Sequence, residues 1–145
     1  MEKIGIIGSG TWGTAIAVLL VNNGHEVTLW SAIPAEIEEM AKTRTHKNLP
    51  GVTLPEGIIY TADLEEAMKD KNLLVMAVPS VFVRSTAQKM KPFCKEGQLI
   101  VDVAKGIEEN TLDTMTQIIK EELPMAETAV LSGFHRRKSY RRKVC

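Results

Sequence analysis

A glycine-rich run near the start of the chain most constrains its fold. The run Gly8–Gly13 (GSGTWG) follows the apolar stretch Ile4–Ile7 and precedes the largely apolar segment Thr14–Leu20. This order predicts a buried strand, a tight turn and a helix. Gly8 permits the turn, Gly10 lets the backbone approach a pyrophosphate, and Gly13 lets the helix pack closely on the strand. The helix N-terminus then offers free N–H groups to phosphates. The run predicts a dinucleotide-binding loop; the alternative is an ordinary strand–turn–helix.

Size and composition fit one globular domain. The chain has 145 residues, of which 44% are hydrophobic and 25% charged, as in soluble proteins. No apolar run approaches the roughly 18 residues that span a bilayer, and the N-terminus lacks the features of a secretory signal. Cys94 and Cys145 match no metal or redox spacing, and His46 lies in a polar loop without ligand spacing. We expect a cytoplasmic protein with no metal site and no membrane span.

Strand and helix patterns alternate along the chain. The expected strands are 4–7, 26–30, 58–60, 73–78, 99–103 and 129–131, and the expected helices are 14–20, one from Pro34, 64–69, 81–90 and 111–122. Asp63 and Glu66 have the spacing of a capping box at the start of helix 64–69. This alternation predicts an α/β fold, a doubly wound parallel sheet of the Rossmann type.

Ligands bind such sheets outside the carboxyl ends of the strands. The turns expected at that edge are Gly8–Gly13, Ser31-Ala32, Pro79-Ser80, Lys105-Gly106 and Ser132-Gly133. Lys105 is the one basic residue that directly follows a core strand, where its ammonium group can donate to an anion or a carbonyl oxygen. A solvated surface charge is the alternative interpretation of Lys105.

These segments together resemble the NAD(P)-dependent glycerol-3-phosphate dehydrogenases from Met1 to Gly133. The matching motifs are GSGTWGTAIA, VTLW, NLPGVTLP, VMAVPSVF, VAKGIEE and AVLSG. The tryptophan inside the glycine run, together with the LPG and KG motifs, is more specific than the glycines alone. Another Rossmann reductase, such as a ketopantoate reductase, would explain the glycines but not this set in this order.

The resemblance implies roles for individual residues. In the family, the loop that corresponds to Gly8, Ser9, Gly10, Thr11, Trp12 and Gly13 holds the cofactor pyrophosphate. Phe82 corresponds to an aromatic residue that lies against the dinucleotide, with a core position in its helix as the alternative. Lys105 corresponds to a lysine that contacts the substrate near the nicotinamide, and is therefore the expected catalytic residue. Gly133 corresponds to a glycine that lines the substrate site.

The implied reaction is hydride transfer between a nicotinamide cofactor and C2 of the substrate, interconverting dihydroxyacetone phosphate and sn-glycerol 3-phosphate for phospholipid synthesis. The residues that follow the second strand, Ser31-Ala32-Ile33, include neither an acid nor an arginine, so NAD and NADP both remain open. The full-length form is expected to be a homo-oligomer. A non-catalytic nucleotide-binding module is the alternative function.

The chain departs from the family after Gly133. Members continue into a helical domain that supplies a second lysine as proton donor, whereas residues 134–145 hold six Lys/Arg and no acid. The first 133 residues therefore carry 12 basic and 18 acidic side chains. We expect a dinucleotide-binding domain over 1–133, inactive alone, and a non-native, disordered tail over 134–145. Residues 134–138 are FHRRK. Codons can be chosen for this segment that, read one base later, encode STAEE, the continuation found in the family. This relation suggests a frameshift. We expect no specific nucleic-acid partner.

Overall fold

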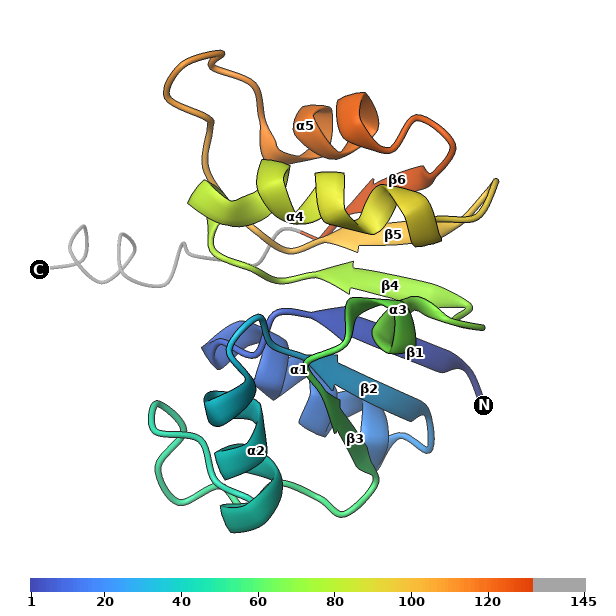
Figure 1. Ribbon diagram of the computed structural model, residues 1–145. Coiled ribbons are helices and arrows are strands. Elements are labelled where there is room, and N and C mark those ends of the chain that lie inside the picture. Colours follow the sequence, from blue (N-terminus) through green and yellow to red (C-terminus); the bar gives the residue numbers. More distant parts are fainter. Residues whose placement is uncertain (132–145) are drawn as a thin grey trace, which may run out of the picture.

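Residues 1–131, which the computed structural model describes, form a six-stranded sheet with helices on both faces (Figure 1). Every pair of neighbouring strands is parallel, and the strand order is β3-β2-β1-β4-β5-β6. The strands are β1 (Lys3–Ile7), β2 (Glu26–Trp30), β3 (Ile58–Thr61), β4 (Leu73–Met76), β5 (Leu99–Asp102) and β6 (Glu127–Val130). This confirms the predicted doubly wound fold. Ser132, Gly133 and the predicted tail 134–145 lie outside the described residues.

Two hydrophobic clusters sandwich the sheet. Helices α1 (Thr11–Asn22) and α2 (Pro34–Thr43) cover one face, where Ala17, Ile37 and Met40 pack on strand residues of β1, β2 and β3. Helices α3 (Leu64–Met68), α4 (Val83–Met90) and α5 (Met115–Glu122) cover the other face (Figure 1). Ile37 and Met40 of α2 are both buried against this face of the sheet.

Several predicted boundaries were wrong by a few residues. The predicted helix 81–90 divides into a 3₁₀ turn, η1 (Ser80–Phe82), and α4, and a second 3₁₀ turn, η2 (Lys91–Phe93), follows α4. The predicted helix 111–122 begins only at Met115. Thr114 caps it, since the Thr114 side chain accepts from the Gln117 N–H and the Gln117 side chain accepts from the Thr114 N–H.

The start of α3 shows a further difference. Asp63 is the N-cap, as predicted, and its carboxylate accepts from the Glu65 N–H at 3.0 Å. The reciprocal half of a capping box runs through Thr61 instead. The Thr61 hydroxyl accepts from the Asp63 N–H at 3.0 Å and donates to the Glu66 carboxylate at 2.8 Å. The spacing of Asp63 and Glu66 predicted where the helix starts, but not the two hydrogen bonds through the Thr61 hydroxyl.

Candidate functional site

The glycine-rich turn lies where the strand order reverses, at the carboxyl end of β1 between β2 and β4. Gly8 has φ of +125°, and a Cβ atom there would come within 2.6 Å of the Ala77 carbonyl carbon. A Cβ atom on Gly13 would collide with the Gly8 carbonyl oxygen. Only glycine fits either position. The tight turn and the close helix packing predicted from the spacing are therefore present.

Gly10 faces open space and begins α1. It is the N-cap residue, and no heavy atom lies within 4 Å of the position that a Cβ atom would take. The first helical bond runs from the Thr14 N–H to the Gly10 carbonyl at 2.9 Å. The amides before Thr14 therefore have no acceptor within the helix. Exposed backbone with first-turn amides fits a phosphate group.

The Ser9 carbonyl points into the protein, where two donors meet it. The Thr14 hydroxyl donates to it at 3.0 Å, and Nε2 of His46 lies 2.9 Å from it. His46 is only 5% exposed, and its Nδ1 accepts from the Asn48 N–H at 3.1 Å. In the sequence, His46 stands in a polar loop without ligand spacing, and no role was expected for it. No spacing signal could have found it, because the contact joins residues 37 positions apart.

A closed loop carries His46. The Leu54 N–H donates to the Arg44 carbonyl, and Nε of Arg44 donates back to the Leu54 carbonyl, each at 2.8 Å. Leu54 is fully buried. This pairing joins the two ends of the segment 44–54 and fixes where His46 enters the protein.

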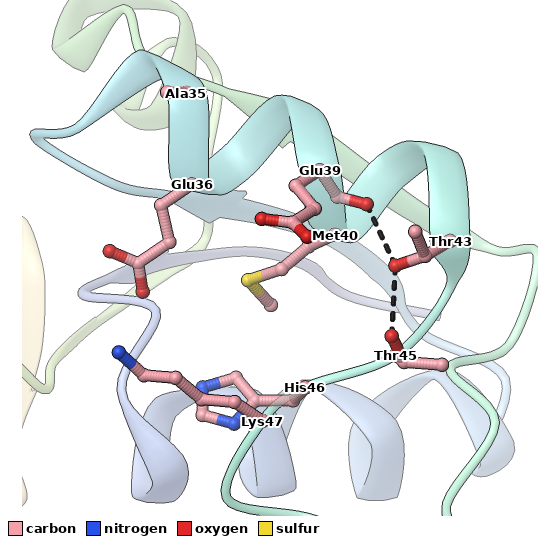
Figure 2. A pocket seen from close by; sticks show the side chains of 8 residues that line it. All are labelled: Ala35, Glu36, Glu39, Met40, Thr43, Thr45, His46 and Lys47. Carbon is pink, nitrogen blue, oxygen red and sulfur yellow. Dashed lines mark hydrogen bonds between the residues drawn. The ribbon is translucent and has the colours of Figure 1, made fainter.

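A pocket of about 410 Å³ lies between α2 and this loop (Figure 2). Figure 2 shows the Glu36 carboxylate and the Lys47 ammonium group pointing toward each other, with Met40 projecting from α2 toward His46 at the base of the pocket. Acidic side chains, Glu36 and Glu39, and a basic one, Lys47, therefore line the same pocket.

Two aromatic side chains lie exposed at the same edge of the sheet. Trp12 in the glycine-rich turn is 57% exposed, and Phe82 at the end of η1 is 55% exposed. The alternative that Phe82 packs in the core is therefore wrong. Gly106 lies against the first residue of η1, because a Cβ atom on it would be 3.8 Å from the Ser80 Cβ. The turns after β4 and β5 thus lie side by side.

Lys105 is exposed in the turn after β5. Asp102 organises the start of this turn, since its carboxylate accepts from the Ala104 N–H at 2.9 Å and from the Thr116 hydroxyl at 3.2 Å. Burial raises the pKa of the Asp102 carboxyl, and the two hydrogen bonds oppose that rise. The turn that presents Lys105 is therefore tied to α5.

Arg84 of α4 clamps the segment beyond Lys105. Its Nε and Nη2 bind both carboxylate oxygens of Glu108, at 2.8 and 2.9 Å, and its Nη1 binds Glu122 of α5 at 2.7 Å. Hydrogen bonds from Arg84 and then Thr111 lower the pKa of the Glu108 carboxyl. Arg84 therefore joins α4, α5 and the segment after Lys105.

Residues 1–131 contain neither a cluster of metal-binding side chains nor a membrane-spanning helix. This part of the chain holds no group of three or more His, Cys, Asp or Glu side chains placed to bind a metal ion. Nor does it contain a helix with the length and apolarity needed to cross a membrane.

Comparison with known proteins identifies relatives by sequence. Residues 3–135 match the family model described as the NAD-dependent glycerol-3-phosphate dehydrogenase N-terminus. A glycerol-3-phosphate dehydrogenase [NAD(P)+] from Agathobacter rectalis is 54% identical over 134 residues, which cover 92% of this chain and 40% of the relative. A Fusobacterium nucleatum protein of the same name is 51% identical, with 92% and 41% covered. The chain thus spans about 40% of the length of these relatives.

Solved structures agree with this assignment. The glycerol-3-phosphate dehydrogenase of Coxiella burnetii aligns with a TM-score of 0.84 at 28% identity, over 91% of this chain and 41% of that one. A ketopantoate reductase from Ralstonia eutropha aligns with a TM-score of 0.71 at 22% identity, over 88% of this chain and 40% of that one, which shows the shared fold alone. The family model covers nearly the whole chain. The chain therefore belongs to the NAD-dependent glycerol-3-phosphate dehydrogenase family and corresponds to its N-terminal region.

Proposed function

We propose that the chain binds a nicotinamide dinucleotide, NAD or NADP, on the Gly8–Gly13 turn. Gly8, Ser9, Gly10, Thr11, Trp12 and Gly13 would hold its pyrophosphate. The observation that carries the proposal is the turn itself, in which exposed Gly10 and the first-turn amides of α1 lie at the reversal of strand order. Family membership gives the ligand class.

We propose further that this domain contributes to the interconversion of dihydroxyacetone phosphate and sn-glycerol 3-phosphate. When bound, the nicotinamide supplies or accepts the hydride. Phe82 would lie against the dinucleotide, Lys105 would bind the substrate oxygens or phosphate, and Gly133 would line the substrate site. The exposure of Phe82 and Lys105 at the carboxyl edge of the sheet supports the first two roles.

Calorimetric titration of the 145-residue chain with NADH and NADPH tests the dinucleotide site. Wild type should bind at least one of them. Gly10→Val should weaken binding tenfold or more, because its side chain fills the space through which the pyrophosphate approaches. Exposed Asn22→Val, at the opposite end of α1 from Gly10, serves as the control. Equal affinity in Gly10→Val and wild type would refute the loop assignment.

Turnover requires a separate test. We propose that the chain alone does not reduce dihydroxyacetone phosphate, because the family's proton-donating lysine lies beyond the matched region. Fusing residues 1–131 to the remainder of the Agathobacter rectalis enzyme should restore turnover. In that fusion, Lys105→Ala should lower kcat/KM by about 10²- to 10⁴-fold, with little change in thermal midpoint. Unchanged turnover would make Lys105 a surface charge.

Further proposals concern the rest of the protein. We infer a cytoplasmic enzyme whose full-length form is a homo-oligomer, and a non-native segment over 134–145 produced by a frameshift. Six basic and no acidic side chains in that segment support the last proposal. Gene sequencing past codon 133 tests it: absence of the helical domain in every reading frame would refute it. We propose no specific nucleic-acid partner. Any nonspecific binding of nucleic acid should come from the basic residues of 134–145, and should therefore weaken with added salt and with deletion of that segment.

A further inference from the structure

We propose that His46 is a positioning residue for the dinucleotide loop, and that it acts through the Ser9 carbonyl. By holding this carbonyl inward, the imidazole turns the Gly10 N–H outward, toward the place of the cofactor phosphate. The inference rests on the proposed dinucleotide binding, and deepens it by adding a residue from a distant loop.

The hydrogen bonds determine which imidazole nitrogen carries the proton. Because the Asn48 N–H donates to Nδ1, this nitrogen is the acceptor and lacks a hydrogen. Nε2 then carries the hydrogen and donates it to the Ser9 carbonyl at 2.9 Å. Each nitrogen of the buried ring has one defined partner, so the ring has a fixed orientation.

Backbone geometry passes this orientation on to Gly10. The described residues contain no cis peptide bond, so the Ser9 carbonyl and the Gly10 N–H point in opposite directions across one planar unit. An inward carbonyl therefore requires an outward N–H. Ser9 is buried while Gly10 is exposed, which matches this arrangement.

His46 supplies something that Thr14 cannot. Thr14 belongs to α1 and donates to Ser9 from within the same turn–helix unit. His46 reaches Ser9 from the loop closed by Arg44 and Leu54. Without it, the buried carbonyl keeps one donor and the peptide unit can rotate more freely. The Gly10 amide would then have to be ordered when the phosphate binds, which weakens affinity.

Two substitutions test the hydrogen bonds of the two imidazole nitrogens separately. In His46→Asn, the side-chain oxygen can replace Nδ1 as acceptor for Asn48, but the side chain is too short to reach Ser9. In His46→Gln, the side-chain NH₂ can replace Nε2 as donor to Ser9, but the acceptor for Asn48 is lost. Each variant thus loses one of the two hydrogen bonds of the imidazole, His46→Asn the one to Ser9 and His46→Gln the one from Asn48. Each variant therefore serves as the control for the other.

Calorimetric titration of the full 145-residue chain with NADH and NADPH, accompanied by thermal unfolding without cofactor, provides the test. We expect H46N to weaken binding about tenfold or more and H46Q to stay within about threefold of wild type. Unchanged affinity in H46N, or losses in both variants that follow their thermal midpoints, would overturn the proposal. Failure of wild type to bind either dinucleotide would refute the proposed function itself.

A measurement on wild type keeps the proposal testable if H46N does not fold. The ¹⁵N shifts of the imidazole ring distinguish the two neutral tautomers. A hydrogen on Nε2 supports the donation to Ser9, and a hydrogen on Nδ1 overturns it.

Discussion

Gly10 and Gly13 are three positions apart, yet a methyl group added to each would meet opposite surroundings. At Gly13 it would collide with the Gly8 carbonyl oxygen, whereas at Gly10 it would project into open space. We predict that Gly13→Ala lowers the free energy of unfolding by about 1–3 kcal/mol. Gly10→Ala, the matched control, should change it by less than about 1 kcal/mol. Urea denaturation of the two variants measures the contrast, and equal losses would contradict it.

Single residues also show which roles could be predicted from the sequence and which could not. The roles of Gly8 and Gly13 in the turn followed from their spacing, because a tight turn and close helix packing are local requirements. His46 could not be found in this way. Its contact with Ser9 exists only once the loop 44–54 has folded back over the turn, and a polar loop residue carries no local mark of such a contact.

At the scale of elements, strands were predicted well and helix starts less so. Strand β2 was predicted with its observed bounds, because Val27 and Leu29 alternate with polar residues as in a strand. The start of α5 was missed although Thr114 and Gln117 have capping-box spacing. The preceding residues Glu108–Leu112 instead form a turn in which Leu112 has φ of +63°. Helix propensity gave no sign of that left-handed residue.

The clamp made by Arg84 predicts a pH-dependent contribution to stability. Because Arg84 holds the pKa of Glu108 below its ordinary range, this contribution is fully present above the unfolded-state pKa, near 4.3. It is lost as the pH falls through the lowered folded-state pKa. We predict that Glu108→Gln lowers the thermal midpoint at pH 7 by a few degrees, and that its difference from wild type shrinks below about pH 4.

Glu109→Gln is the control for this effect, since the adjacent Glu109 is exposed and outside the Arg84 cluster. Scanning calorimetry from pH 3 to pH 8 measures both variants. A Glu108→Gln deficit that does not vary with pH would show that the ion pair is not its source.

At the scale of the whole molecule, the β5–β6 end of the sheet has an apolar edge. Strand β6 is the last in the strand order, and Val130 and Leu131 are 60% and 56% exposed. Exposed apolar side chains beside an open strand edge favour association between chains. We predict concentration-dependent self-association that the double substitution Val130→Thr and Leu131→Thr reduces. Sedimentation velocity is the measurement, and identical profiles would contradict the prediction.

The pairing of Arg44 with Leu54 also has a consequence for hydrogen exchange. The Leu54 amide is buried and bonded to the Arg44 carbonyl, so it takes up deuterium only when the loop opens. Opening also withdraws His46 from Ser9. A dinucleotide held on the glycine-rich turn should therefore slow uptake at Leu54, which lies outside the turn, and leave the Leu123 amide of the α5 terminus unchanged. Slower uptake in the turn without slower uptake at Leu54 would show that the loop and the turn open independently.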